Sequence, residues 1–443
     1  MDIALNTIRG IAFIITQPII ILGMIVFALV FYKQNKKTVV MQKMIIGEPL
    51  NSPFELTISQ IVIGILAGVI GSVILSYLGV MFDEHSAIGL IFLVSLLLMF
   101  INPRYICFSY SGAIIGFISV GLNEIATLNK GVVLNFFGQT INLSNIDILK
   151  IDVVSLMTLV GVLHIIEGLL VLIDGKKGSI PVFTNKDGNI IGGFALKRYW
   201  LLPITIMVLG ATSRITGTGN GISIATPEGW PFINSGFSLA AINAGIISIL
   251  PLFAGVGYNS ITFTKNKTQK TLISGGMIFS FGLLLTLVAQ FGNNNFLTKL
   301  LVIVFAPLAH EGMLRLNKYI ENKGEIKYIS SADSIMVLDV APNTPAEEMG
   351  IKSGDKIIEI NNRKIESEEQ IISIMTGTSN FFWFKIKKPS GEVKEVHYNK
   401  MNPGKRLGLI FVPLGVPKDS VVVKFDETKF SDVLNKIKNK KDE

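Results

Sequence analysis

Long apolar runs separated by short polar or basic segments dominate the first three quarters of the chain. A helix needs about 20 predominantly apolar residues to cross a bilayer, and these runs approach that length. The pattern predicts an α-helical polytopic membrane bundle over residues 1–320, with about nine helices. We expect the spans near Gly10–Tyr32, Thr57–Phe82, Ala87–Ile101, Tyr105–Leu122, Val153–Ile173, Tyr199–Thr212, Phe237–Tyr258, Thr271–Gly292 and Phe296–Leu314.

The composition and the placement of basic residues agree with a membrane protein. Hydrophobic residues make up 49% of the chain and charged residues 16%, and the mean hydropathy is +0.54. The net charge of +8 comes from lysines and arginines in alternate loops, which is the positive-inside pattern rather than a nucleic-acid surface. Nine spans then place the N-terminus outside and the C-terminal region in the cytoplasm. The predicted inner loops hold Lys33 to Lys43, Arg104, Lys176 to Arg198, and Lys265 to Lys270.

The first apolar run lacks the features of a cleaved signal peptide. No basic region precedes it, and no small-residue cleavage site follows. We therefore expect a retained span.

The C-terminal part contains a polar stretch with strong local structural signals, PNTPAEEMGIKSGDKIIEIN at 342–361. Thr344 followed by Pro345 predicts a helix start, and Gly350 predicts its end. Strands are expected at Ile335–Val340 and Lys356–Ile360, on either side of this helix. This order of elements resembles bacterial PDZ domains. The resemblance implies a small α+β PDZ-like domain at 327–412, followed by a basic C-terminal tail at 413–443.

A PDZ domain implies a peptide partner bound along an exposed strand edge. By this resemblance, a strand and a helix form the groove, with residues Ser334, Ile335, Met336, Val337, Ile371 and Met375. Free N–H groups near Ser331 to Ser334 would receive a terminal carboxylate. Asp333 would repel that carboxylate, so internal segments or folded partners suit the groove better. Alternatively, Ile371 and Met375 are core residues only.

Four ionisable residues in the predicted spans form a candidate intramembrane polar network, His164, Glu167, His310 and Glu311. Such groups are costly in lipid and should pair inside the bundle. The segment HEGML at 310–314 begins like a zinc-protease helix, but Leu314 replaces the second histidine that this motif needs. A zinc site built from His164, His310 and a carboxylate such as Asp174 is disfavoured, because the two histidines are expected about 7 Å apart in depth. The sequence therefore predicts no metal and no cofactor, and it predicts no disulfide, because Cys107 is the only cysteine.

Three sequence segments carry a resemblance to a family, namely HIIEG at 164–168, IIGGFALKRYWLLP at 190–203 and VLDVAPNTPAEEMGI at 337–351. With the multi-span architecture, they resemble the MinJ family of cell-division topological determinants. The resemblance implies a non-enzymatic scaffold enriched at septum and poles, which links a DivIVA-type protein to the MinC–MinD (MinD-type) division inhibitor. An intramembrane-protease-like or envelope-sensing membrane protein, whose PDZ domain binds peptide substrates, stays open as the alternative.

Overall fold

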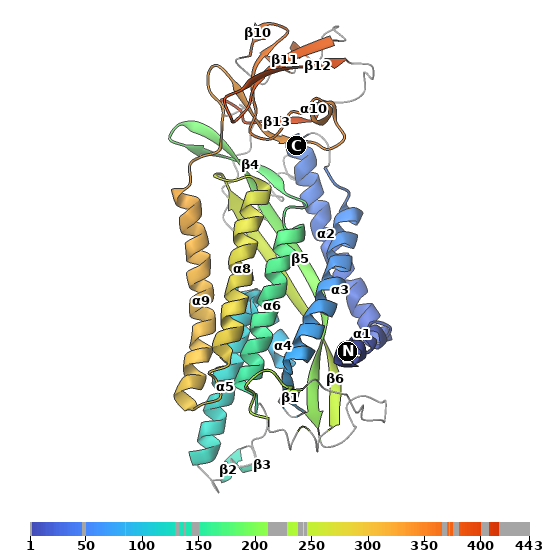
Figure 1. Cartoon of the computed structure of the whole chain (residues 1–443), viewed down its shortest axis with the longest axis vertical. Helices are drawn as coiled ribbons and strands as arrows, with labels where there is room; N and C mark the ends of the chain where they lie inside the picture. The colour runs from blue at the N-terminus through green and yellow to red at the C-terminus, as the bar shows by residue number, and fades with distance from the viewer. Residues whose placement is uncertain are drawn as a thin grey trace. The chain divides into compact units, whose positions relative to one another are not determined.

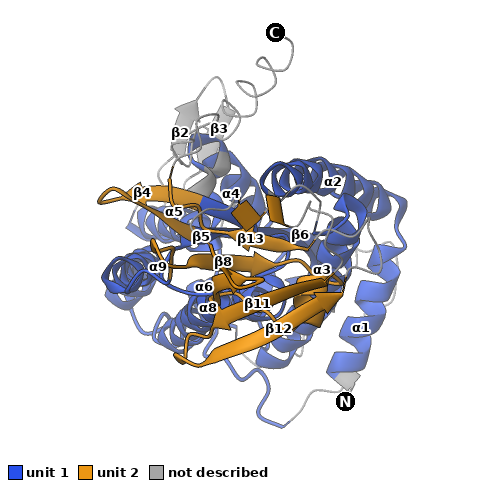
Figure 2. Ribbon diagram, turned by 90° about the horizontal axis from the view of Figure 1, so that it is seen from above, with its two compact units in different colours: residues 1–182, 193–327 blue, residues 183–192, 328–443 orange. Residues whose placement is uncertain are grey.

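The chain forms two compact units in a computed structural model (Figure 2). Unit 1 comprises Met1–Val182 and Gly193–Lys327, and unit 2 comprises Phe183–Gly192 and Tyr328–Glu443. The structure describes residues 2–46, 50–84, 86–128, 133–136, 139–142, 150–210, 228–237, 242, 246–365, 370–371, 373–374, 381–399 and 407–415. Most of the basic C-terminal tail predicted at 413–443, and most of the segment between the predicted sixth and seventh spans, lie outside these residues.

Among its described residues, unit 1 contains six helices that are long and apolar enough to cross a membrane. They are α2 (Pro18–Ile46), α3 (Pro53–Leu78), α5 (Phe108–Leu128), α6 (Val153–Asp174), α8 (Lys267–Ala289) and α9 (Phe296–Lys323), and they form the elongated helical part of this unit (Figure 1). A separate helix, α1 (Asp2–Ile15), precedes α2. The predicted first span is thus broken near Gln17, because Pro18 occupies the first position of a new helix, where its missing N–H is not needed.

The third predicted span is a short helix. Helix α4 (Leu90–Ile101) has 12 residues, which is about 18 Å of helix and less than a bilayer core. A 3-10 turn, η1 (Pro103–Ile106), follows it, and α5 then begins at Phe108. The inner loop expected at Arg104 is therefore a turn between a part-length helix and a full-length one.

The sixth and seventh predicted helices are wrong, because both segments are strands. Strands β5 (Asn189–Gly210) and β6 (Ile246–Thr262) pair antiparallel from Phe194↔Thr262 to Gly210↔Ile246. The short strand β1 (Met81–Asp83) pairs in parallel with the end of β5. These runs are rich in β-branched and aromatic residues, which favour strands, whereas apolar length alone does not separate the two structures. The assignment of loops to the two sides of the membrane by nine successive helices therefore no longer applies.

Helix α3 covers the backbone of β5. A Cβ atom on Gly64 would lie 2.3 Å from the carbonyl oxygen of Leu201, and one on Gly68 would lie 2.2 Å from that of Pro203. One turn further, the Ser72 hydroxyl accepts a hydrogen bond from the N–H of Thr205 at 2.9 Å. The small residues of α3 therefore allow contact with the strand, and Pro203 lacks an N–H where α3 lies closest.

Helix α6 lies at the centre of unit 1 and contacts α8 through two pairs of glycines. A Cβ on Gly282 would lie 2.6 Å from the carbonyl oxygen of Gly161, and one on Gly275 would lie 2.9 Å from that of Gly168. Such close approach is possible only without side chains, so this stripe specifies how the two antiparallel helices meet.

Unit 2 contains a six-stranded sheet with the order β12-β11-β9-β8-β13, and β10 (Arg363–Lys364) pairs with β9. The other strands are β8 (Ile335–Val340), β9 (Lys356–Ile360), β11 (Phe381–Lys387), β12 (Val393–Asn399) and β13 (Leu409–Phe411). Helix α10 (Pro345–Glu348) begins at Pro345 as predicted, although the Thr344 hydroxyl donates to the carbonyl of Ala341 rather than capping the helix. Strand β7 (Tyr328–Ile329) pairs with the start of β5, and β4 (Ile180–Lys186) precedes that start.

Beyond these elements, β2 (Val133–Phe136) and β3 (Gln139–Asn142) form a short hairpin between α5 and α6.

Candidate functional site

The strand expected to receive a peptide, β8, has a neighbour on each side. Met336 pairs with Lys356 of β9, and Val337 pairs with Phe411 of β13. Strand β13 therefore occupies the edge of β8 from Val337 onward, and the described strand that ends this side of the sheet is β13 itself.

The proposed carboxylate site at the start of β8 is also occupied. The N–H of Ser331 donates to the carbonyl of Ser334 at 3.0 Å, and the N–H of Ser334 donates to the carbonyl of Ser331 at 3.0 Å. The N–H of Met336 donates to the hydroxyl of Ser330. Ile371 is 2% exposed and packs in the core of unit 2, whereas Met375 lies outside the described residues. Two of the N–H groups expected to receive a peptide terminus, those of Ser331 and Ser334, are therefore already hydrogen-bonded within unit 2.

Two of the four network residues, His164 and His310, lie side by side with Cys107. The ring centroids of the histidines are 5.6 Å apart, and the Cys107 sulfur lies 3.0 Å from His164 Nε2 and 3.4 Å from His310 Nε2. The histidines were expected at different depths because α9 was predicted to end at Leu314. Helix α9 instead continues to Lys323, so His310 lies near its middle.

Both imidazoles are oriented by hydrogen bonds from Nδ1. His164 Nδ1–H donates to the carbonyl of Val160 at 2.7 Å. Tyr110 donates its hydroxyl proton to Glu311, so its oxygen accepts from His310 Nδ1–H at 3.3 Å. These assignments leave each Nε2 with a lone pair directed toward the Cys107 sulfur. Sequence reasoning missed Cys107 and Tyr110, although the break at Asn102-Pro103 marked the turn that precedes them.

Glu167, the fourth member of the predicted network, forms no hydrogen bond with these side chains among the described contacts of α5, α6 and α9. The predicted network therefore divides. Glu311 reaches His310 through Tyr110, and His164 is bonded to backbone and to Cys107.

Asp174, considered above as a zinc ligand, belongs to a different cluster. Its carboxylate accepts hydrogen bonds from Arg198 and from the indole N–H of Trp200 at 2.9 Å. Ser59 donates to its other oxygen at 3.1 Å, and Lys177 lies 3.3 Å from the same atom. The Asp174 and Arg198 side chains are 0% and 1% exposed, so this is a buried ion pair that links α6, β5 and α3.

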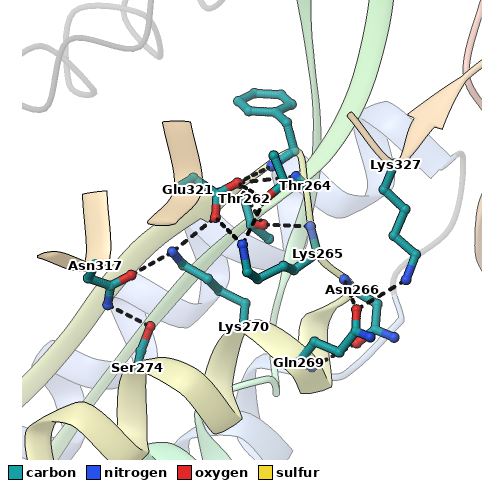
Figure 3. Close-up of polar contacts among 11 residues, drawn as sticks. Thr262, Thr264, Lys265, Asn266, Gln269, Lys270, Ser274, Asn317, Glu321 and Lys327 are labelled. Atoms are coloured by element: carbon teal, nitrogen blue, oxygen red, sulfur yellow. Dashed lines mark hydrogen bonds and ion pairs between the residues drawn. The ribbon is translucent and has the colours of Figure 1, made fainter. Parts of the chain in front are cut away.

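A second charged cluster lies where β6, α8 and α9 meet (Figure 3). Oε1 of Glu321 accepts hydrogen bonds from the backbone N–H groups of Phe263 and Thr264 and from the hydroxyls of Thr262 and Thr264, at 2.8–3.1 Å. Its Oε2 accepts from Lys270 at 3.1 Å, and the Lys270 side chain is 4% exposed. Lys270 also donates to Asn317, which donates to Ser274. This cluster fixes the end of α9 to the β6–α8 turn.

Comparison with known proteins identifies unit 2. The PDZ domain family matches residues 336–381, which lie within the predicted PDZ-like domain. No curated protein matches the chain. Together with the six candidate spans, the match defines a multi-pass membrane protein with a C-terminal PDZ domain, a domain class that binds peptides and proteins.

Proposed function

We propose that this chain is a non-enzymatic membrane adaptor whose PDZ domain binds extended segments of protein partners along β13. The observation that supports this proposal is the position of β13 at the end of the sheet, next to β8. A strand in that position offers backbone donors and acceptors to an incoming segment, which extends the sheet by one strand. Backbone hydrogen bonds then supply affinity, and side-chain pockets supply specificity.

Leu409 is the residue of β13 whose backbone faces a partner. The carbonyl of Gly408 accepts from the N–H of Ala341, so Gly408 faces β8. The next residue in an extended strand turns its backbone groups to the other side. Leu409 therefore directs its N–H away from β8, and its side chain is half-buried against the core of unit 2.

We further propose that the PDZ domain lies in the cytoplasm. The Glu321 cluster places the end of α9 beside the start of α8, and a Cβ on Gly175, at the end of α6, would lie 3.2 Å from Thr271 near that start. Gln42 of α2 donates to the carbonyl of Ser179 just after α6. This end of unit 1 gathers the basic residues Lys36, Lys37, Lys43, Lys176, Lys177, Lys265, Lys267, Lys270, Lys318 and Lys323. The positive-inside rule assigns such an end to the cytoplasm, and unit 2 resumes directly after α9. The N-terminus is then outside.

The partners that we propose are division proteins. The resemblance of the segments at 164–168, 190–203 and 337–351 to the MinJ family supports a link between a DivIVA-type protein and a MinD-type inhibitor at septum and poles. In this proposal the lipid bilayer holds unit 1, while unit 2 binds one of the two proteins.

Proline substitutions in the two outer strands of the PDZ sheet, β13 and β12, test whether a partner binds along β13. Leu409→Pro removes the outward N–H of β13 and leaves the ladder to β8 intact. Val393→Pro is the matched control, because Glu392 accepts from Lys388 and Val393 therefore faces outward at the opposite edge. Fluorescent fusions of the full chain should be enriched at the septum for wild type and Val393→Pro, and diffuse in the membrane for Leu409→Pro. Purified DivIVA-type and MinD-type proteins are then tested for binding to each variant.

Two results would contradict the proposal at different points. A diffuse wild-type signal, with no binding to either purified protein, would remove the division function. Equal behaviour of the two proline variants would show that partners do not bind at β13.

A further inference from the structure

We propose that Cys107, His164 and His310 form an intramembrane binding site for a borderline-soft transition-metal ion, with Zn²⁺ as the probe. One ligand atom from each residue lies within 4.8 Å of the other two. Thiolate sulfur and imidazole nitrogen are the ligands that zinc prefers, and three protein ligands leave a fourth position for water or another group. No carboxylate belongs to this set, so Mg²⁺ and Ca²⁺, which need oxygen ligands, do not fit.

The spacing of the ligand atoms suits a tetrahedral ion. Zinc bonds of about 2.3 Å to sulfur and 2.0 Å to nitrogen place the two ligand atoms about 3.5 Å apart at a tetrahedral angle. The observed separations from the Cys107 sulfur are 3.0 Å to His164 Nε2 and 3.4 Å to His310 Nε2, and the two Nε2 atoms lie within 4.8 Å of each other. Both sulfur–nitrogen distances therefore need to lengthen by only a few tenths of an ångström to accept the ion.

The surroundings of the two histidines are those of metal ligands. A ligating histidine usually donates its other ring N–H to a carbonyl, hydroxyl or carboxylate, which fixes the ring and raises its basicity. His164 donates to the carbonyl of Val160, and His310 donates to Tyr110, which donates to Glu311. Phe281 contacts both rings edge-on, at centroid distances of 4.9 and 5.5 Å. Each Nε2 is therefore held toward Cys107 before any ion binds.

Cys107 lies where the helix is interrupted, between the turn η1 and the first residue of α5, and the N–H of Ser109 donates to its sulfur at 3.4 Å. When a cation binds the sulfur, the displaced thiol proton passes to solvent or buffer. Interrupted helices inside membrane proteins often line ion sites, because their free backbone groups need a polar lining. The ion would hold together α5, α6 and α9.

Alkylation of Cys107 tests this site without interference, because the chain has no other cysteine. The full chain is purified in detergent, stripped with a chelator, and treated with N-ethylmaleimide in the presence or absence of stoichiometric Zn²⁺. Intact-mass measurements then give the rate. We expect Zn²⁺ to slow alkylation at least about tenfold and to bind at one ion per chain, because the bound thiolate is withdrawn from reaction. Mg²⁺ should have no effect.

Histidine variants distinguish a three-ligand site from zinc bound to the thiol alone. His164→Gln and His310→Gln should lose the protection, whereas His397→Gln, which removes an imidazole of unit 2, should keep it. Because a histidine variant can also fail to fold, Co²⁺ is added to the wild-type chain as a second measurement. We expect a thiolate-to-cobalt charge-transfer band together with the visible bands of a tetrahedral ion. If Zn²⁺ does not slow alkylation of the wild type and the cobalt band is absent, the proposal is overturned. Cys107 is then a thiol hydrogen-bonded to the two imidazoles with no ion. Protection that persists in His164→Gln and His310→Gln would overturn it as well.

Discussion

The close contact between α6 and α8 makes a sharp prediction about two glycine positions of α8, Gly282 and Gly276. Gly282→Ala adds a Cβ that would lie 2.5 Å from the backbone nitrogen of Ile165 and 2.6 Å from the carbonyl oxygen of Gly161. Gly276→Ala, in the same helix, adds a Cβ with nothing within 4 Å. The two variants therefore carry the same chemical change in opposite environments.

The size of the difference follows from these distances. Ordinary van der Waals contacts of a Cβ begin at 3.4 Å. In Gly282→Ala, α6 and α8 must therefore separate by about 1 Å, because the backbone atoms that the new Cβ meets cannot rotate away. Overpacking of this kind costs about 1–3 kcal/mol. Alanine is also a better helix former than glycine by about 1 kcal/mol, a gain that both variants share and that Gly276→Ala measures alone. We expect Gly282→Ala to be less stable than Gly276→Ala by about 1–3 kcal/mol.

Thermal unfolding of the purified full chain in detergent is the assay. Because membrane proteins rarely refold after heating, midpoints are compared at one heating rate rather than converted to equilibrium free energies. Gly276→Ala should unfold at or above the wild-type temperature, and Gly282→Ala several degrees below it. Indistinguishable midpoints for the two variants would show that α6 and α8 do not meet at Gly282 and Gly161.

Three further predictions concern the polar clusters and the pH dependence of unit 2. Glu321→Gln removes the charge beside the buried Lys270 and should lower the free energy of unfolding by about 1.5–3 kcal/mol, seen as a lower unfolding midpoint. Glu325→Gln, at an exposed position, should match wild type. Equal midpoints for the two variants would refute the stabilising role of the Glu321 cluster. Asp174→Asn leaves the Arg198 guanidinium buried without its carboxylate and should lower the free energy of unfolding by about 3–5 kcal/mol. The double variant Asp174→Asn with Arg198→Met should recover part of that loss. A double variant no more stable than the single one would contradict this expectation. Burial raises the pKa of Tyr328 to about 12, so its stabilising contribution is present below the ordinary tyrosine pKa of about 10 and is lost as pH rises from there to about 12. An absorbance titration of Tyr328→Phe should lack one phenol that ionises near pH 12, and an unchanged high-pH step would count against the assignment.

The PDZ domain was predictable because its signals are local. Thr344-Pro345 does begin α10, and Gly350 and Gly354 do adopt the left-handed backbone that their turns need, with φ of 73° and 94°. The peptide edge was not predictable in the same way. Strand β13 follows β8 by about seventy residues in the sequence, and its insertion beside β8 is a non-local pairing that no short stretch encodes.

The membrane unit shows where apolar length stops being informative. The runs at Tyr199–Thr212 and Phe237–Tyr258 are apolar enough for helices, yet most of their described residues belong to β5 and β6, which pair with each other. The glycines of α3 predict a close neighbour, but the sequence does not reveal that this neighbour is the backbone of a strand.

His164 and His310 were predicted in one polar network, but at different depths. The last span was predicted to end at Leu314, just before the basic residues Arg315 and Lys318, whereas α9 continues to Lys323. Long basic side chains extend toward the interface from within a helix, so their appearance does not mark its last turn. Moving one end of a helix by nine residues moves its midpoint by about 7 Å, which is the depth difference that was expected between the two histidines.

The buried Asp174–Arg198 pair bears on what unit 1 does beyond holding the chain in the bilayer. An anchor needs only apolar length, and removing two charges from water costs several kcal/mol per ion, which an apolar pair of similar volume would avoid. The carboxylate of Asp174 binds Arg198 and Trp200 of β5 and Ser59 of α3, so it fixes the β5–β6 hairpin against α6 and α3 at once. Buried polar groups that cost stability are well explained where they specify one arrangement among several apolar alternatives. An anchor has no use for such specification, so we expect this pair to hold unit 1 in one defined arrangement of β5, α6 and α3 rather than to add stability.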